Sequence, residues 1–518
     1  MDNSFDAIVI GSGLGGLTAG ALYARTGARV LLLERNAAFG GAATTYQRGT
    51  LTIEASLHET THPATPGGDP KREVFDALDL YDDIELTPVD DFQEIRCALI
   101  GEPFVMPHGF EAVEADLTER FPHQRKNIRA FLRQVRRSLQ LGAFRSPDHG
   151  LFWRTVHAAE LPLDLWAILR DIRSSLSDVL ERFFGDDEAI KFALAGNLPY
   201  FTDDPDDVWW LAYVFVQGGY LQGGGYYIKG GSQSLSDRLA EIIREAGGET
   251  LTSAPATGIE LGPGGEVTGA RYRASGDTEQ VAYAPLVFAN AAPHVIEGLL
   301  PNENRDAFMS PFRDRPLSIS LLSATIGVDR RPAEFGFSSY STVLIPDWMT
   351  KFSDFRKATD LLGDMPGERM PVMCVVDYSH IDSGLAEGGV FPVNIVCADR
   401  LENWQGLSDE DYRQRKDAWL GAIVRRLDAE WPGIADAVVE SSIATARSMQ
   451  QHLNTPGGAI YGFALSRPEE YPKGPPQTFE TAIKGLWLSS AYAGGGGFTG
   501  AISAGAGAVR AVLSDRHS

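Results

Sequence analysis

The first forty residues contain the pattern that most constrains the fold. A short apolar run, Phe5 to Ile10, is followed at once by the turn Gly11-Ser-Gly-Leu-Gly-Gly16 and by a helix-forming stretch, Leu17 to Tyr23. A second apolar run, Val30 to Leu33, ends at the acid Glu34. This order of strand, glycine-rich turn, helix, strand and acid predicts a dinucleotide-binding βαβ unit.

Each glycine of the turn has a physical role. Gly11 permits the tight turn, Gly13 lets the backbone approach a pyrophosphate, and Gly16 lets helix and strand pack closely. The helix that begins near Leu14 and Gly15 presents free N–H groups and a positive dipole end to phosphate. We therefore expect all five residues to contact the cofactor.

The residues that follow the second strand help to choose the cofactor. Glu34 is placed to accept a hydrogen bond from a ribose hydroxyl, and Arg35 follows it. A second glycine pair, Gly40-Gly41, then leads into Ala42. The arrangement resembles the two-dinucleotide-binding-domain flavoproteins, which implies FAD rather than NAD and places these residues near it. A surface turn is the alternative for the glycine pair.

Composition agrees with a large enzyme. The 518 residues are 43% hydrophobic, enough for a substantial core and two to four domains. A net charge of −23 argues against nucleic-acid binding. The three cysteines are too few for a disulfide framework, and no export signal precedes the first strand, so we expect a cytoplasmic protein. The sequence specifies no oligomeric state.

The pattern of segments predicts a Rossmann-like α/β flavoprotein with a discontinuous FAD domain and an inserted α+β substrate domain. Residues 1–75, 223–310 and 441–518 are assigned to the FAD domain. Residues 76–222, expected to be mostly helical, and 311–440 are assigned to the substrate domain. Within the helical part, apolar residues recur at helical spacing over 124–141 and 169–192.

Three further motifs sharpen the resemblance. The middle run Tyr226-Tyr-Ile-Lys-Gly-Gly-Ser, the later Phe288-Ala-Asn-Ala and the glycine-rich run from Gly485 to Ala501 are similar to those of phytoene desaturase-like flavoenzymes. This family includes carotenoid desaturases, carotenoid isomerases and retinol saturases, and lies within the amine oxidase superfamily. The resemblance implies further FAD contacts at Ala256, Asn290, Ala291, Ser490, Ala491, Phe498, Thr499, Gly500 and Ala501.

Two positions depart from the family pattern. The family usually has an acid near the position of Ala491, which could bind flavin phosphate or ribityl hydroxyls, and alanine cannot do so. In the early segment that ends at His58, Ser56 stands where glycine is usual. Neither departure removes FAD binding, but both weaken assignment to any one member enzyme.

One apparent metal motif is rejected. His58-Glu-Thr-Thr-His62 matches the zinc signature HExxH, which requires a helix so that both histidines face one way. Two threonines lie between them, Pro63 follows directly, and a proline- and glycine-rich stretch comes next. These residues favour strand and loop, so we expect no bound metal.

Catalytic groups are harder to identify, because the flavin carries out the hydride chemistry and the protein supplies position and electrostatics. His58 and Glu59 are the best polar candidates, since the resemblance places them just beyond the cofactor. His58 could instead only orient its neighbours. Tyr461 resembles a residue on the substrate side of the flavin, and a core aromatic is its alternative.

The substrate is expected to be small and hydrophobic. Aromatic residues between the FAD segments suit an apolar tunnel: Phe144, Phe152, Trp153, Trp166, Phe183, Phe184, Phe201, Trp209 and Trp210. The stretch Leu151 to Leu169 could be a lid or a contact with the inner face of the membrane, or a helix packed on the core. The shorter run Val208 to Val216 is expected to be buried.

The leading function is therefore an FAD-dependent oxidation, reduction or cis–trans isomerisation of carbon–carbon bonds in a polyisoprenoid or carotenoid-like substrate. An FAD-dependent amine oxidase acting on a C–N bond is the alternative. Some amine oxidases place a lysine beneath the flavin. Lys229 and Lys484 are accounted for by neighbouring motifs, so no lysine stands out for that role.

The cofactor assignment predicts the behaviour of one variant. Gly13→Val places a side chain where the pyrophosphate is expected, so purified variant protein should be colourless while wild-type protein is yellow and releases FAD on denaturation. Absorbance spectra and chromatography of the released flavin check this. Full flavin occupancy in the variant would overturn the assignment.

Overall fold

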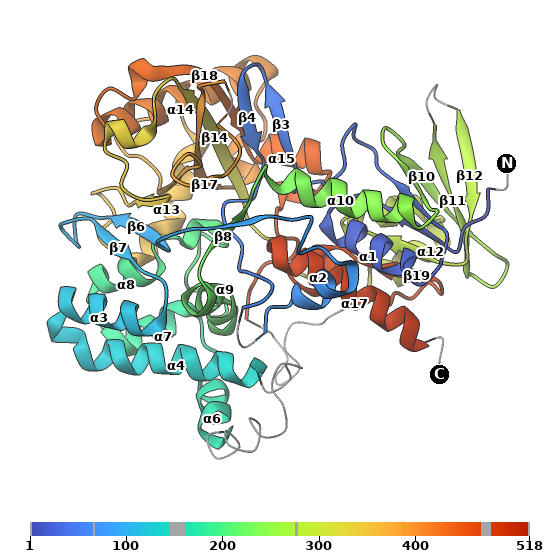
Figure 1. Ribbon diagram of the computed structural model, residues 1–518, viewed down its shortest axis with the longest axis horizontal. Helices are drawn as coiled ribbons and strands as arrows, with labels where there is room; N and C mark the ends of the chain where they lie inside the picture. Colours follow the sequence, from blue (N-terminus) through green and yellow to red (C-terminus); the bar gives the residue numbers. More distant parts are fainter. Residues whose placement is uncertain are drawn as a thin grey trace.

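A computed structural model describes residues 3–65, 68–143, 161–274, 278–386, 388–467 and 478–515. The chain forms two halves side by side, with both termini on the same half (Figure 1). The half that carries the termini is built on a five-stranded parallel sheet. Its strands, in spatial order, are β19 (Leu486–Leu488), β13 (Val287–Ala289), β1 (Ala7–Ile10), β2 (Val30–Leu33) and β9 (Glu249–Leu251).

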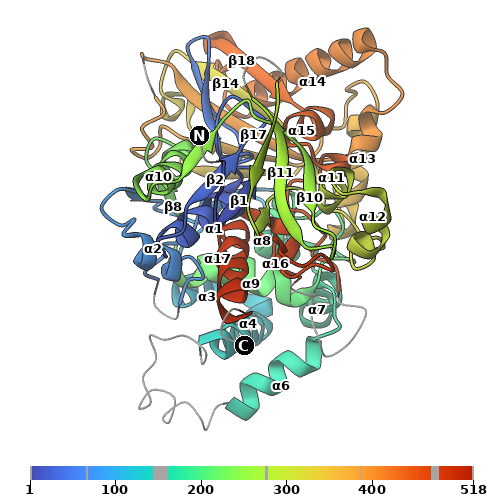
Figure 2. The same cartoon turned by 90° about the vertical axis from the view of Figure 1, so that its right-hand side faces the viewer.

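Both faces of this sheet are covered, as a parallel sheet requires. Ala7 and Val9 of β1 pack against the helices of one face, while Ile8 and Ile10 pack against the opposite layer. The period of two along the strand therefore divides its residues between two cores. The helical layer contains α1 (Leu14–Ala24), α10 (Ser232–Glu245) and α17 (Gly497–Asp515), and Figure 2 shows α1 and α17 together beside the sheet.

The opposite layer is an antiparallel meander with two helices. It contains β10 (Ala256–Leu261), β11 (Val267–Arg273), β12 (Glu279–Tyr283), α11 (Pro293–Leu299) and α12 (Asn302–Met309). Two short helices flank this half of the molecule, α2 (Arg72–Leu78) and α16 (Ala491–Gly494).

The second half contains a seven-stranded mixed sheet. In spatial order its strands are β18 (Val438–Ala444), β14 (Ser320–Val328), β17 (Phe391–Asp399), β16 (Met373–Asp377), β15 (Ser341–Leu344), β6 (Gln93–Arg96) and β7 (Phe104–Met106). Neighbouring strands are antiparallel except β15 and β6, which pair in parallel.

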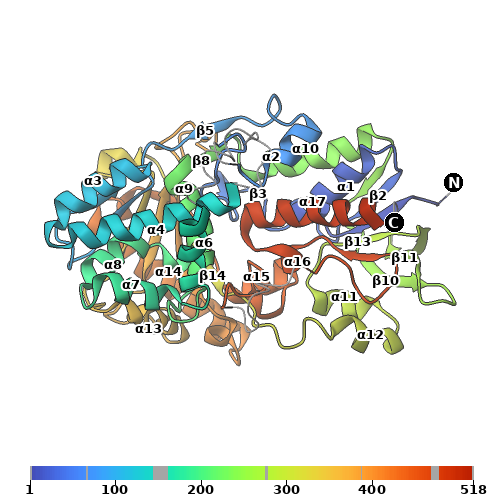
Figure 3. The same ribbon diagram turned by 90° about the horizontal axis from the view of Figure 1, so that it is seen from below.

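Helices cover both faces of this sheet as well. One face packs against α14 (Asp409–Glu430) and α15 (Ala446–Leu453). The other packs against a helical layer that Figure 3 shows from below. This layer contains α3 (Phe110–Arg120), α4 (Arg125–Ala143), α6 (Leu161–Asp171), α7 (Leu176–Phe184), α8 (Glu188–Ala195), α9 (Trp210–Gly223) and α13 (Phe355–Asp360).

Two antiparallel ribbons complete the described elements. They are β3 (Thr45–Arg48) with β4 (Leu51–Glu54), and β5 (Leu86–Pro88) with β8 (Tyr226–Ile228). Within the described ranges, no helix combines the length and the apolar character needed to cross a membrane.

A buried carboxylate joins the first ribbon to α10. Glu54 is 1% exposed and lies at the end of β4. Its oxygens accept hydrogen bonds from the backbone N–H of Ser232 at 2.8 Å, the Ser232 hydroxyl at 2.7 Å, the Thr45 hydroxyl at 2.8 Å and the backbone N–H of Leu57 at 3.0 Å. Glu54 therefore caps α10 and fixes the turn that leads toward residue 58.

The structure adds detail to two expectations about helical segments and corrects one expectation about burial. The helical spacing over 169–192 corresponds to the end of α6 and to two further helices, because Ser175 and Asp178 form a capping box that starts α7, and Gly185 ends it. The segment 76–222 also supplies two strands, β6 and β7, to the mixed sheet. The run 208–216 is not wholly buried, since Phe215 is 50% exposed on α9.

The stretch predicted as a lid, a membrane contact or a packed helix falls partly outside the described residues, which omit 144–160. Its remainder forms α6, where Pro162 occupies the first turn, a position that proline tolerates. Trp166 is 60% exposed there, so this face of α6 is not packed on the core. The predicted boundaries of the five segments stay a prediction.

Candidate functional site

The glycine-rich turn connects β1 to α1 and packs against Asn290. Gly11 has a φ of +94°, a conformation that favours glycine. A Cβ on Gly13 would lie 2.7 Å from the Asn290 side-chain nitrogen, and one on Gly15 would collide with the carbonyl oxygen of Ser489. A Cβ on Gly16 would likewise collide with the carbonyl oxygen of Gly11. The glycines of the turn therefore let Asn290 and Ser489 pack directly against its backbone.

The second glycine pair lies directly on this turn. The Gly40 N–H donates to the Ser12 carbonyl at 3.0 Å, and Gly41 faces the Cα of Gly13. Glu34 is 4% exposed, and its carboxylate accepts from the backbone N–H groups of Ser12 at 2.9 Å and Asn36 at 2.7 Å. Glu34 thus also holds the glycine-rich turn in place.

The N-terminus of α1 is open, in contrast to that of α10. Gly13 is the N-cap of α1, and within the described residues no side chain caps it and no acid lies in its first turn. In α10 the corresponding position is filled by the Glu54 carboxylate. The free N–H groups of α1 therefore fit the phosphates of a dinucleotide.

The other predicted cofactor residues lie at several places around this turn. Ala42 accepts a hydrogen bond from Ser56, Ala291 accepts one from Ser490 at 3.2 Å, and Ala256 begins β10. Ala491 begins α16, while Phe498, Thr499, Gly500 and Ala501 form the first turn of α17. The carbonyl of Ala501 faces Gly15, so the starts of α1 and α17 meet. Leu14 is the first residue of α1.

Arg35 is engaged elsewhere. Its guanidinium donates to the carbonyls of Gln451 and His452 at the end of α15, at 2.7 and 2.8 Å. The structure thus places Arg35 against a helix C-terminus, where a cation is favourable. Direct cofactor contact by Arg35 and by the other predicted residues stays a prediction.

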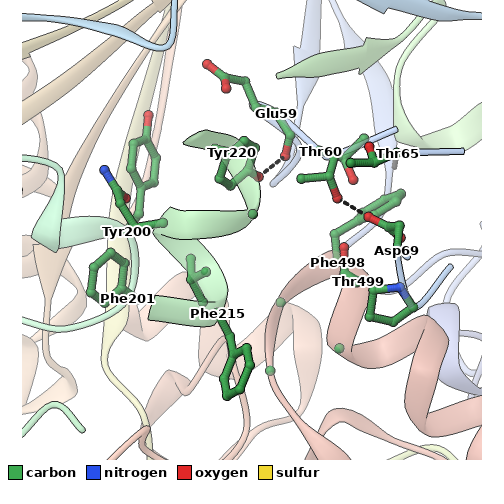
Figure 4. A pocket seen from close by; sticks show the side chains of 18 of the residues that line it. Glu59, Thr60, Thr65, Asp69, Tyr200, Phe201, Phe215, Tyr220, Phe498 and Thr499 are labelled. Carbon is green, nitrogen blue, oxygen red and sulfur yellow. Dashed lines mark hydrogen bonds between the residues drawn. The ribbon is translucent and has the colours of Figure 1, made fainter. Parts of the chain in front are cut away.

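A large cavity opens beside the start of α17. Its volume is about 1330 Å³, and it is lined from both halves of the molecule (Figure 4). Gly497, Phe498 and Thr499 border it on the side of α17. The rest of the lining is largely apolar or aromatic and includes Phe92, Leu139, Tyr200, Phe201, Tyr220, Tyr461 and Leu465. Such a cavity suits a long apolar ligand.

The cavity uses few of the aromatic residues that were expected to form a tunnel. Phe201 lines it. Phe184 and Trp210 are instead in the core beneath the helical layer. Phe144, Phe152 and Trp153 lie outside the described residues. The sequence could not distinguish aromatic residues of the core from those of the cavity wall, because both environments are apolar.

Three tyrosines fix the segment that enters the cavity. The hydroxyls of Tyr378, Tyr340 and Tyr220 donate to the carbonyls of residues 57, 58 and 59 at 3.0, 2.6 and 3.0 Å, respectively. Each tyrosine comes from a different part of the chain. Figure 4 shows the bond from Tyr220, and the three bonds together hold this non-helical segment in one conformation.

His58 and Glu59 both line the cavity. His58 Nε2 and Glu59 Oε2 are buried and have no hydrogen-bond partner within the described residues. Burial lowers the pKa of His58 to about 4 and raises the pKa of Glu59 to about 8. At neutral pH both side chains are therefore uncharged, and Glu59 holds a proton.

Tyr461 also lines the cavity and packs on the chain just before α17. A Cβ on Gly496 would contact its backbone, and one on Gly497 would lie 3.9 Å from its ring. Its ring therefore borders the cofactor end of the cavity, and burial raises the pKa of its hydroxyl. The catalytic roles of His58, Glu59 and Tyr461 stay predictions.

The residues of the rejected zinc motif are not helical. His62 stacks edge-on against Tyr226, with ring centroids 4.9 Å apart, and its Nδ1 accepts the backbone N–H of Ala64 at 3.0 Å. His58 faces Tyr200 instead, with centroids 5.2 Å apart. The two histidines therefore have different surroundings, and only His58 lines the cavity.

The structure identifies a buried lysine that the sequence did not single out. Lys71 is 1% exposed, and its ammonium donates to Thr61 at 2.8 Å, Asp69 at 2.9 Å and Thr499 at 3.0 Å. Its three N–H bonds are thus used to tie the cavity segment to the start of α17. No sequence signal could show this, because Thr499 is 428 residues away.

Two buried amides in the cavity wall, Asn197 and Gln217, were also missed. Gln217 had a detectable signal. It follows directly on the apolar run of α9, where an amide is out of place unless it is bonded.

Comparisons with known proteins agree with this architecture. The family model for an NAD(P)-binding Rossmann-like domain matches residues 9–77. The chain is 24% identical to all-trans-retinol 13,14-reductase of Danio rerio, over 88% of this chain and 77% of that protein. It is 26% identical to prolycopene isomerase 1 of an Oncidium hybrid cultivar, over 93% of this chain and 79% of that protein.

Solved structures share the fold along the whole chain. An oxidoreductase from Methanosarcina mazei has a TM-score of 0.62 at 16% identity, with 98% of this chain and 99% of that one covered. A putrescine oxidase variant has a TM-score of 0.61 at 14% identity, with 99% of each chain covered. The predicted fold class and the predicted family resemblance are confirmed, and a dinucleotide-type flavin cofactor is supported.

The burial of Glu59 predicts a pH dependence of stability. The folded protein keeps this proton up to about pH 8, whereas the unfolded chain loses it near the ordinary value of 4.5. The unfolding free energy of wild-type protein should therefore fall with rising pH across this window, relative to Glu59→Gln, by about 1.4 kcal/mol per pH unit. Denaturant unfolding of both proteins between pH 5 and 8 measures the difference.

A matched control distinguishes the effect of burying the Glu59 carboxyl group from the effect of removing any carboxylate. Glu73 lines the same cavity but is exposed, so Glu73→Gln should follow the wild-type pH dependence. A difference between wild type and Glu59→Gln that does not change with pH would show that Glu59 is ionised in the folded protein.

Proposed function

We propose that the protein is an FAD-dependent oxidoreductase that acts on carbon–carbon bonds of a long polyisoprenoid or conjugated polyene substrate. The reaction is a desaturation, a saturation or a cis–trans isomerisation. One observation carries the proposal: an apolar cavity of about 1330 Å³ meets the first turn of α17 and contains two uncharged titratable side chains, His58 and Glu59.

The residues present fit FAD. The open N-terminus of α1 and the bare turn at Gly13 would hold the pyrophosphate, and Glu34 would bind the ribose. The first turn of α17, at Gly497 to Gly500, would face the isoalloxazine ring. When bound, the flavin supplies hydride exchange with the substrate.

The chain's own residues account for the remaining requirements. The aromatic walls bind and orient the substrate and exclude water. Saturation of a double bond adds a hydride and a proton, and Glu59 is a group in the wall that holds a proton at neutral pH. His58 is neutral with Nε2 unbonded, so it can accept a proton when the reaction runs toward desaturation.

The similarity to retinol reductases and prolycopene isomerases supports a substrate of this class. The amine oxidases resemble the chain only at 14% identity, which bears on the fold alone. The buried lysine nearest to α17 does not favour the alternative, because Lys71 has its three donors bonded. A cytoplasmic location with contact at the inner membrane face remains a prediction from the sequence.

Anaerobic mixing tests the reaction class. The holoenzyme should exchange electrons with a conjugated polyene or polyisoprenoid, or isomerise it, and should leave benzylamine and putrescine unchanged. The flavin absorbance bands report reduction and reoxidation, while chromatography of the products detects an isomerisation without net redox change. Rapid flavin bleaching by an amine, with all polyenes inert, would assign the protein to the amine oxidases instead.

A further inference from the structure

A hydrogen-bonded amide pair lies in the cavity wall away from α17. Asn197 follows α8, and Gln217 belongs to α9. The side-chain nitrogen of Asn197 donates to the side-chain oxygen of Gln217 at 3.1 Å. Both residues line the cavity and are at least nine-tenths buried, with 7% and 1% exposure.

Each amide has one further polar atom without a partner. Asn197 Oδ1 and Gln217 Nε2 are buried and have no hydrogen-bond partner within the described residues. A buried polar group left unbonded destabilises the folded protein, so two in one pair require an explanation. Neither amide takes part in the contacts that hold the 57–59 segment or the start of α17.

The pair offers one acceptor and one donor, whichever way the amides are oriented. If oxygen and nitrogen were exchanged in both side chains, the bond between them would be kept, and one donor and one acceptor would again be left. The ligand that matches must therefore accept one hydrogen bond and donate another.

A hydroxyl group meets this requirement, because its oxygen accepts while its O–H donates. A carboxylate only accepts and an ammonium only donates, so either would leave one amide atom unbonded. Within the described part of the chain, the cavity offers neither ion an unpaired buried charge: Lys71 and Asp69 are bonded to each other, and Glu59 is protonated at neutral pH. A hydrocarbon would leave both amide atoms unbonded.

We propose that Asn197 and Gln217 bind a hydroxyl group of the substrate, so that the enzyme acts on a long apolar alcohol in preference to an unsubstituted hydrocarbon. The inference rests on the proposed function, because it takes this cavity as the substrate site. The remaining chain lies against the aromatic wall, where Tyr200 and Phe201 follow Asn197 by three and four residues. Burial of each CH₂ there adds to the affinity, and the hydroxyl sets the position of the chain along the cavity.

Calorimetric titration of the holoenzyme tests the inference with three probes: geranylgeraniol, its methyl ether and the corresponding hydrocarbon without the hydroxyl. The ether can accept a hydrogen bond but cannot donate one. We expect the alcohol to bind at least tenfold more tightly than either analogue. Equal affinity of wild-type protein for all three would overturn the inference.

A double variant identifies the residues responsible. In Asn197→Leu/Gln217→Leu both partners of the pair become apolar, so no polar atom is stranded and folding is retained more readily than after a single change. This variant should bind the hydrocarbon at least as well as wild type and lose its preference for the alcohol. A preference that persists in the variant would overturn the assignment to this pair.

The control is Gln222→Leu, which removes an amide from the same helix and the same cavity and should keep the preference. The wild-type comparison of alcohol with ether does not depend on any variant folding. If the hydrocarbon binds as tightly as the alcohol and exchanges electrons with the flavin, the hydroxyl inference alone fails. If no probe binds and no polyene reacts, the proposed function fails and the inference fails with it.

Discussion

The site depends on the burial of one carboxylate, Glu54. Its oxygens accept hydrogen bonds from β3, from the start of α10 and from the turn after β4, and the side chain is almost inaccessible to solvent. A buried polar group is tolerated only when it is hydrogen-bonded in this way. The turn it fixes leads the chain from the cofactor half into the cavity, where three tyrosine hydroxyls bind consecutive carbonyls. The position of His58 and Glu59 follows from these bonds.

The placement of acidic side chains at helix N-termini also distinguishes the site for phosphate from the substrate cavity. Glu54 occupies the N-terminus of α10, which is therefore unavailable to a ligand, while α1 has glycine at its N-cap and remains open to phosphate. Beyond the N-terminus of α1, where phosphates would bind, the residues that surround the site change from polar to apolar. There the cavity keeps Glu59 protonated and His58 neutral although the chain carries a net charge of −23. Among the residues that line the cavity, Glu73 and Asp76 are exposed and Asp69 is paired with Lys71, while the buried His58 and Glu59 are neutral.

The sequence predicted the parts of the structure that depend on local pattern. The glycine-rich turn, the strands 7–10 and 30–33 and the acid Glu34 follow from residues close together in the chain, and the structure places them as a βαβ unit. The segment with His58 and Glu59 was recognised, but not the reason for its conformation, because its tyrosine partners are 161 to 321 residues away. Lys71 escaped prediction for the same reason, whereas the Asn197–Gln217 pair spans only 20 residues and Gln217 carried a detectable signal in the apolar run of α9. Cavity-lining aromatics were confused with core aromatics because hydrophobic pattern reports burial and not the neighbouring space.

We infer that substrate and flavin meet where the first turn of α17 borders the cavity that contains His58 and Glu59. A crystal structure of the flavin-loaded protein with a bound polyisoprenoid tests it most directly. We expect the flavin phosphates at the N-terminus of α1, the isoalloxazine ring at Gly497 to Gly500, and the ligand along the aromatic wall within reach of Glu59. A ligand bound outside this cavity, or a flavin whose ring is turned away from α17, would contradict it.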